Sequence, residues 1–177
     1  MVGARRIWIE RDYESCSGCR RCEIACSLYH EGRVWPEASR VRVFMLIPGV
    51  EIPHLCFQCE DYPCVNACPS GALSVDAETG AVRVDASRCT SCGVCITACP
   101  GRVPHLHPRK DHIVICDLCD GDPRCVEACR MGRWNALRAV PRVEGVSYRL
   151  YAKTPEILTS AVARRLFGEE IAREVEG

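Results

Sequence analysis

The chain has 177 residues and carries 23 basic and 23 acidic side chains, so its formal net charge is zero. Basic and acidic residues are interleaved, which argues against a nucleic-acid-binding surface, and no run of about 18 to 20 apolar residues predicts a membrane-spanning helix. This length allows one or two domains. The 16 cysteines are far more than an average globular domain of this size contains.

Short strands are predicted along the chain, each next to a cysteine-rich segment. Alternation of apolar and polar residues indicates them. The predicted strands are 7–10, 41–47, 72–75, 81–85 and 112–115. The third and fourth form a hairpin around a turn at 76–80. Because the elements are short and aromatic residues make up 6% of the chain, bound cofactors are expected to supply part of the folding free energy.

Short helices are predicted where each cysteine-rich segment ends. A five-residue phrase that begins and ends with cysteine, with alanine before the last cysteine, occurs four times, at 22–26, 64–68, 95–99 and 125–129. Cysteines four positions apart lie on one face of a helix. Pro63 and Pro123 suit the first helical position, and Asp122 suits the N-cap before Pro123. The predicted fold class is α+β, built from two ferredoxin-like modules.

A longer helix is predicted near the C-terminus. Thr154 and Pro155 suit its N-cap and first position, and the helix is expected to end before Gly168. Its apolar stripe consists of Ile157, Leu158, Ala161, Val162 and Leu166. We expect this helix to dock on a catalytic partner or on a second copy of the chain; packing on its own core is the alternative.

The sixteen cysteines fall into four groups of four. The groups are Cys16/Cys19/Cys22/Cys26, Cys56/Cys59/Cys64/Cys68, Cys89/Cys92/Cys95/Cys99 and Cys116/Cys119/Cys125/Cys129. The third group has the spacing C-x2-C-x2-C-x3-C followed by Pro100, the bacterial ferredoxin pattern, in which three thiolates hold one 4Fe-4S cluster and the fourth ligates its neighbour. The sequence therefore predicts four 4Fe-4S clusters and a role in electron transfer.

Disulfide bonds and zinc are the alternatives for so many cysteines. Residues 1–7 contain no apolar core of signal-peptide length, so the chain is expected in the cytoplasm rather than in an oxidising compartment. Zinc ribbons use two C-x2-C pairs about 15 to 20 residues apart, whereas here four cysteines crowd each short segment. Such crowding suits a bulky cubane better than one tetrahedral ion.

Four clusters would change the charge of the chain. Sixteen thiolates add about sixteen negative charges and four oxidised cubane cores return about eight positive ones, which leaves about minus eight. Basic residues beside the motifs are candidates to offset this charge. They are Arg20, Arg21, Arg88, Arg109, Lys110, Arg124, Arg130 and Arg133. The histidines have no metal-binding spacing and are expected on the surface or in the core.

No catalytic residue is predicted. If all sixteen thiolates are ligands, every iron has its protein ligand and no coordination position remains open for a substrate. The sequence also lacks the glycine-rich dinucleotide motif, the P-loop and the zinc-protease motif. We therefore expect the isolated chain to be a non-catalytic electron carrier.

The motifs and their order carry a family resemblance. The Cys-Pro endings at Pro69 and Pro100 and the compressed fourth motif at 116–125 resemble the four-cluster electron-transfer subunits that accompany enzymes of the dimethyl-sulfoxide-reductase family. The small size and short fourth motif are most similar to the polyferredoxin subunits beside tungsten-containing aldehyde oxidoreductases. The resemblance spans roughly residues 5–140.

Departures from the family pattern concern the outer clusters. No proline follows Cys26 or Cys129, and residues 130–134 read Arg-Met-Gly-Arg-Trp where relatives usually continue with proline and small residues.

The resemblance implies which cysteines share a cluster. In relatives the second and third motifs form one two-cluster half, and the first and fourth form the other. Carried over, the ligand sets are Cys16/Cys19/Cys22/Cys129, Cys56/Cys59/Cys64/Cys99, Cys89/Cys92/Cys95/Cys68 and Cys116/Cys119/Cys125/Cys26. The predicted hairpin supports the inner half, but loop lengths leave open a pairing of the first motif with the second and of the third with the fourth.

The expected domains follow from this arrangement. A four-cluster domain is expected at 1–142, with an inner module at about 48–111 and an outer module formed by 1–47 and 112–142. A C-terminal extension is expected at 143–177. The implied function is electron relay between a catalytic oxidoreductase subunit, of tungsten- or molybdenum-pterin type, and a further redox subunit, acceptor or donor. The alternative is a free-standing soluble polyferredoxin that shuttles between enzymes.

Overall fold

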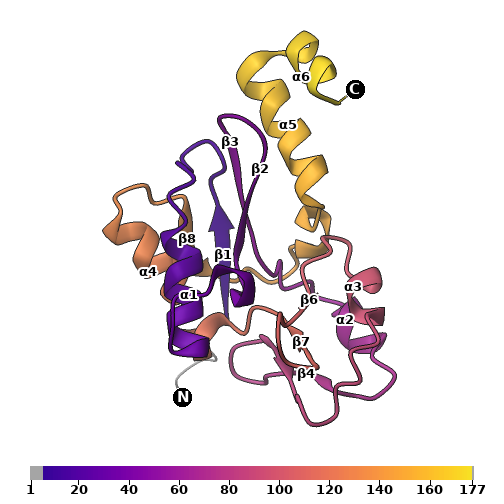
Figure 1. Cartoon of the computed structure of the whole chain (residues 1–177). Coiled ribbons are helices and arrows are strands. Elements are labelled where there is room, and N and C mark those ends of the chain that lie inside the picture. The colour runs from indigo at the N-terminus through magenta and orange to yellow at the C-terminus, as the bar shows by residue number, and fades with distance from the viewer. Residues whose placement is uncertain (1–5, 177) are drawn as a thin grey trace.

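The computed structural model describes residues 6–176 as short helices and two-stranded antiparallel sheets (Figure 1). This α+β arrangement confirms the predicted fold class. The expectation for the N-terminal segment falls largely on residues 1–5, which lie outside the described residues.

Each sheet within residues 6–176 is a single pair of antiparallel strands. The pairs are β1 (Ile7–Arg11) with β8 (Leu137–Pro141), β2 (Arg42–Ile47) with β3 (Val50–His54), β4 (Leu73–Val75) with β5 (Val82–Val84), and β6 (His105–Leu106) with β7 (Ile113–Val114). The predicted hairpin at 72–85 is therefore present as β4 and β5. β1 and β8 join the two ends of the cysteine-rich region.

The helices are short and mostly begin at a cysteine motif. They are α1 (Arg21–Glu31), α2 (Pro63–Asn66), α3 (Val94–Ala98), α4 (Arg124–Met131), α5 (Pro155–Phe167) and α6 (Glu169–Glu176), with 3-10 turns η1 (Pro36–Ala38), η2 (Leu118–Gly121) and η3 (Tyr148–Tyr151). Cys22/Cys26 and Cys125/Cys129 each lie within one helix, whereas α2 and α3 end just before Cys68 and Cys99.

The predicted helix starts are right for α2 and off by one residue for α4. Pro63 is the first residue of α2. α4 begins at Arg124, so Pro123 occupies the N-cap position. Asp122 does not cap the helix because it ends the preceding η2 turn, where its N–H donates to the carbonyl of Cys119. Its carboxylate instead pairs with Arg124 at 3.1 Å.

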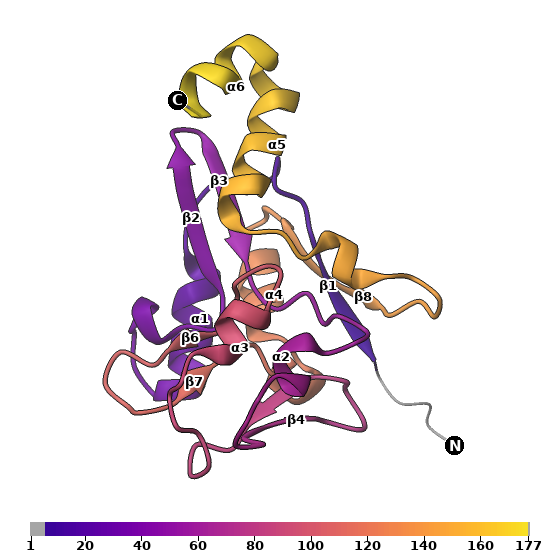
Figure 2. The same ribbon diagram turned by 90° about the vertical axis from the view of Figure 1, so that its right-hand side faces the viewer.

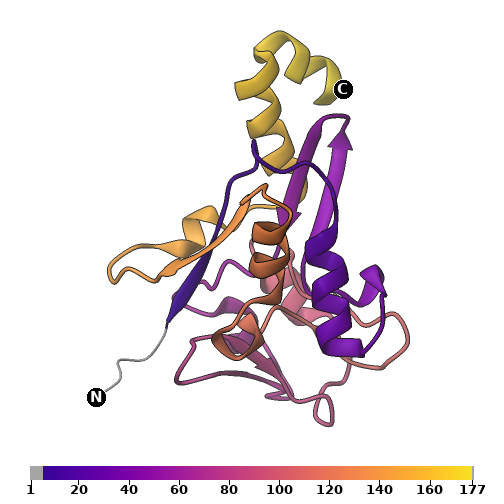
Figure 3. The same cartoon turned by 90° about the vertical axis from the view of Figure 1, so that its left-hand side faces the viewer.

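Segments far apart in the sequence lie side by side in two groups. α1 packs along α4, as Figure 3 shows, next to the β1–β8 pair. α2 packs against α3 beside β4, as Figure 2 shows. The first motif therefore lies near the fourth, and the second near the third.

Cysteines make up much of the main core. Ten of the sixteen are buried, and nine of these ten pack in the main core with aliphatic side chains such as Ile9, Leu55, Leu118 and Leu137. All sixteen are free thiols.

A second, smaller core forms where the C-terminal helix meets the β2–β3 hairpin (Figure 1). Val162 and Ala163 of α5 pack on Ile47, Val50 and Ile52. The helix has the predicted bounds, with Thr154 at the N-cap and Pro155 at the first position.

The predicted apolar stripe of α5 is only partly the buried face. Val162 is buried and Leu158 is partly buried, but Ile157, Ala161 and Leu166 are exposed. Thr159 and Ala163 are buried instead. Small side chains let the helix approach the hairpin closely, which a count of apolar residues does not reveal.

Candidate metal centres

Three cavities are each lined by four cysteines drawn from two motifs. One is lined by Cys16, Cys19, Cys22 and Cys129, a second by Cys68, Cys89, Cys92 and Cys95, and a third by Cys26, Cys116, Cys119 and Cys125. We call these quartet I, quartet III and quartet IV, after the motif that contributes three cysteines. Each draws its fourth cysteine from the distant motif of the same half of the molecule.

The remaining four cysteines form quartet II, which comprises Cys56, Cys59, Cys64 and Cys99. Burial is the main cause that raises the pKa values of Cys56, Cys59 and Cys64 to about 12. The negative charge of an ionised Cys99 raises all three further. Such mutual repulsion requires that the four thiols lie close together.

The four C-x-x-C loops share one backbone feature. The residue before the second cysteine has a left-handed conformation in every motif, at Gly18, Gln58, Ser91 and Leu118, with φ between 50° and 67°. At Gly18 a Cβ would come within 2.7 Å of Glu51 Cγ, so a larger residue there would displace the Glu51 side chain as well as adopt a strained backbone. The other three positions hold strained non-glycine residues, a pattern that occurs at functional sites.

Helices send their cysteines to different quartets. The cysteines four positions apart in α1 and α4 divide between quartets I and IV. Those at the ends of α2 and α3 divide between quartets II and III. Each short helix therefore spans two centres.

Backbone N–H groups donate to several of the sulfurs. Arg40 donates to Cys26 Sγ at 3.2 Å and Gln58 donates to Cys56 Sγ at 3.4 Å. Val103 and Ile113 donate to Cys99 and Cys89, both at 3.5 Å. Such donors stabilise a thiolate and are one means by which a protein sets the potential of an iron-sulfur centre.

Exposure differs between the quartets. Quartets I and III each include an exposed cysteine, Cys19 and Cys92. In quartet IV every cysteine is buried, and in quartet II three are. Burial raises the pKa values of Cys116 and Cys125 well above the usual 9. Cys68 of quartet III is only partly buried. Desolvation raises its pKa, but hydrogen bonds from Ser70, Leu73 and Ala72 outweigh this effect and lower the pKa below its usual value.

The donor set fits 4Fe-4S clusters. Four soft thiol ligands converge at each centre, which is the ligation such clusters require. Some buried polar atoms near quartet II have no hydrogen-bond partner among the described residues. They are the side-chain amide atoms of Gln58 and Nε of Arg11. Buried polar groups normally have partners, and a loaded centre would add sulfur atoms to this neighbourhood.

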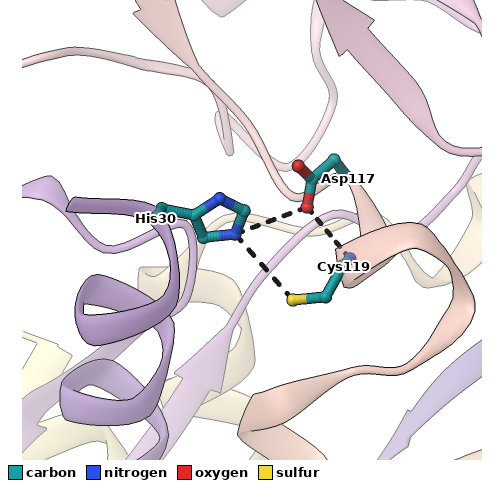
Figure 4. A group of neighbouring side chains, drawn as sticks. All are labelled: His30, Asp117 and Cys119. Atoms are coloured by element: carbon teal, nitrogen blue, oxygen red, sulfur yellow. Dashed lines mark hydrogen bonds and ion pairs between the residues drawn. The ribbon is translucent and has the colours of Figure 1, made fainter. Parts of the chain in front are cut away.

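A histidine and a carboxylate lie beside quartet IV (Figure 4). His30 Nε2 lies 3.8 Å from Cys119 Sγ and 3.4 Å from Asp117 Oδ1. Asp117 Oδ1 also accepts a hydrogen bond from the Cys119 N–H at 3.0 Å. Because Cys119 also lines the quartet IV cavity, the three residues are not a separate metal site. The prediction gave His30 only a surface or core role and missed this contact.

The basic residues expected to offset cluster charge are divided between two roles. Arg20 and Arg21 line the quartet I cavity, and Arg124 interacts with Cys119. Arg88 donates to the Ser70 carbonyl. Among the described residues, the others do not contact a cysteine thiol: Arg130 pairs with Glu127, Lys110 pairs with the buried carboxylate of Glu31, Arg109 stacks on Trp35, and Arg133 is exposed.

Sequence reasoning missed Arg11, a basic residue whose guanidinium donates a hydrogen bond to the Cys56 carbonyl. Arg11 directly follows the predicted strand at 7–10, and nothing in the local sequence indicates that its side chain reaches a cysteine motif more than 40 positions away.

Within residues 6–176, none of the helices combines the length and the apolar character needed to span a bilayer.

Two family models match the chain. A model described as "4Fe-4S dicluster domain" matches residues 49–138, and one described as "4Fe-4S binding domain" matches residues 13–29. Between them they include all four motifs.

Curated relatives extend the similarity over most of the chain. An aliphatic sulfonate oxidoreductase polyferredoxin-like subunit of Pyrococcus furiosus is 54% identical over 93% of this chain and 95% of that protein. The electron transport protein HydN of Escherichia coli is 35% identical over 69% of this chain and 82% of its own. The thiosulfate reductase electron transfer subunit PhsB of Salmonella typhi is 36% identical over 67% of this chain and 68% of its own.

Proposed function

We propose that this chain, which belongs to the family of polyferredoxin-like 4Fe-4S electron-transfer subunits of oxidoreductase complexes, relays electrons between a catalytic subunit and a second redox partner. Bound 4Fe-4S clusters supply reversible one-electron transfer. Sixteen cysteines in four groups correspond to four such clusters.

The proposed ligand sets are quartets I to IV. The cavities of quartets I, III and IV support them, because each cavity brings the fourth cysteine of a distant motif beside three local ones. Electrostatic coupling supports quartet II. The crossed arrangement explains why the N-terminal and C-terminal parts of residues 6–142 fold together.

The observation that carries the relay is the order of the centres. α1 and α4 link quartet I to quartet IV, and the pKa of buried Cys116 is raised further by Cys56, so quartet IV lies next to quartet II. α2 and α3 then link quartet II to quartet III. The exposed cysteines belong to the two end members of this series, which suits electron exchange with partners at both ends.

The protein's own groups would tune and insulate this path. Backbone donors from Arg40, Gln58, Val103 and Ile113 hold sulfurs of three quartets. Aliphatic side chains around quartets II and IV, the two middle members of the series, exclude water. With every cysteine used as a ligand, we propose that the isolated chain has no catalytic activity of its own.

The proposed main partner is a catalytic oxidoreductase subunit of tungsten- or molybdenum-pterin type. The name of the Pyrococcus furiosus relative, a subunit of an aliphatic sulfonate oxidoreductase, supports a catalytic partner. Anaerobic purification of the native chain, with tungsten and molybdenum analysis of co-eluting proteins, tests this. A second subunit that carries either metal is expected; recovery of the chain alone would favour the free-standing shuttle.

Paired substitutions test the crossed ligand sets. Cys26→Ala with Cys116→Ala should remove one cluster, because both residues belong to quartet IV. Cys26→Ala with Cys16→Ala should damage two clusters, because the residues belong to quartets IV and I. Iron and sulfide content and reduced-state electron paramagnetic resonance would be measured on both. If Cys26→Ala with Cys16→Ala removes one cluster and Cys26→Ala with Cys116→Ala removes two, each motif holds its own cluster. The proposed ligand sets of quartets I and IV would then be wrong.

A further inference from the structure

Arg11 at the end of β1 is a half-buried cation held by backbone carbonyls. Its Nη1 donates to the Ile9 carbonyl at 2.7 Å, and its Nη2 donates to those of Leu55 at 3.2 Å and Cys56 at 2.5 Å. The guanidinium also stacks over the Phe57 ring, 4.3 Å from its centre. These contacts fix the guanidinium directly beside the first cysteine of quartet II.

Arg11 lies between quartets II and IV, the two middle members of the series of centres. Its charge interacts with the thiols of Cys56 in quartet II and of Cys116 and Cys125 in quartet IV. Burial lowers the pKa of Arg11, but an arginine stays protonated at neutral pH. A permanent positive charge therefore lies at the junction between the two centres.

Arg11 lacks an acidic partner. Within the part of the chain that the structure describes, its hydrogen bonds go to neutral carbonyls and no carboxylate forms an ion pair with it. Its Nε–H has no acceptor there either. Withdrawing a charge from water is costly when no opposite charge lies nearby, and the metal-loaded quartets would supply that opposite charge.

We propose that Arg11 is the internal counter-charge of the clusters in quartets II and IV and raises the reduction potentials of both. This inference rests on the proposed ligand sets. Reduction adds a negative charge to a cluster, and a nearby cation stabilises that charge more than it stabilises the oxidised form. Burial of quartets II and IV disfavours the added negative charge, and the positive charge of Arg11 offsets this effect, so both centres remain reducible.

The test is a redox titration of loaded Arg11 variants, followed by electron paramagnetic resonance. Arg11→Met and Arg11→Gln remove the charge, and Arg11→Lys keeps it. Arg138→Met is the matched control, because Arg138 lies on the partner strand β8, pairs with Glu10 and is 52% exposed. In the two neutral variants, two of the four one-electron steps should shift to lower potential by about tenfold in equilibrium constant, or about 59 mV each.

Separate readouts distinguish the two proposals. Iron and sulfide content tests whether four clusters are present, and the titration tests Arg11. In Arg11→Lys the reduction potentials should stay close to those of the wild type, because the positive charge is kept. In Arg138→Met the potentials of all four steps should be unchanged. Unaltered potentials in a fully loaded neutral variant would overturn the proposal. Loss of the clusters of quartets II and IV from both neutral variants would also overturn the proposal, because Arg11 would then be a structural residue only.

Discussion

Buried carboxylates connect the segments around the centres at the scale of single residues. Glu23 accepts a hydrogen bond from the Val43 N–H at 2.6 Å, which ties α1 to β2. Glu31, at the end of α1, accepts from Arg40, His107 and Lys110, so it joins α1 to two later segments. Burial alone would raise the pKa of Glu31, but these hydrogen bonds outweigh it and lower the pKa to about 2.

Glu31→Gln should destabilise the loaded protein by about 2 kcal/mol at pH 7. A lowered pKa means that the ionised side chain contributes fully above its ordinary pKa of 4.5 and that this contribution is lost as the pH falls toward about 2. Anaerobic denaturation at pH 7 measures the effect. Glu144→Gln, at an exposed position, is the control; equal stability of the two variants would contradict the prediction.

At the scale of elements, α5 and the β2–β3 hairpin form a core of their own. Ala163 is buried between this helix and the hairpin, whereas Ala161 is exposed. Among the residues whose burial is described, the small core holds no cysteine. Docking of α5 on a partner stays a prediction, and it now concerns the exposed Ile157, Ala161 and Leu166.

Ala163→Asp should detach α5 without loss of clusters, because an unpaired carboxylate cannot be buried against Ile47 and Val50. Limited proteolysis should cleave the C-terminal segment faster, while iron content and visible absorption stay at wild-type values. Ala161→Asp is the matched control and should resist cleavage like the wild type. Iron loss in Ala163→Asp would mean that α5 supports the metal centres.

At the scale of the whole molecule, metal binding and folding are one process. Ten buried cysteines contribute to the interior, so the apolar core alone is small. In the absence of iron, buried thiols with raised pKa values remain protonated and leave the core without its cross-links.

Anaerobic removal of iron by a chelator should therefore unfold the chain cooperatively. Far-ultraviolet circular dichroism should lose its helical signal together with the visible absorption, and reconstitution with iron and sulfide should restore both. A chain that keeps its secondary structure after complete iron loss would show that the aliphatic core suffices.

Local spacing made much of this architecture predictable. The cysteine groups, the β4–β5 hairpin and the bounds of α5 depend on residues close in the sequence. The role of Arg11 does not, because it arises only when β1 lies beside the loop at Leu55 and Cys56. The cap at Asp122 was misjudged because the preceding turn fixes that residue's backbone. The buried face of α5 is set by the shape of the hairpin, which the helix sequence does not encode.

The pairing of β1 with β8 has a consequence for biosynthesis. Glu10 and Arg138 face each other across this sheet but are 128 positions apart in the chain. At about 5 to 20 residues per second, a ribosome needs roughly 6 to 25 s to make that intervening stretch. β1 therefore remains unpaired for this time during synthesis, whereas β4 and β5 can pair soon after both are made because they are close in the sequence. The first cysteine motif is thus made before the other three, but it meets the fourth motif, with which it shares two quartets, only when the last of the four has been synthesised.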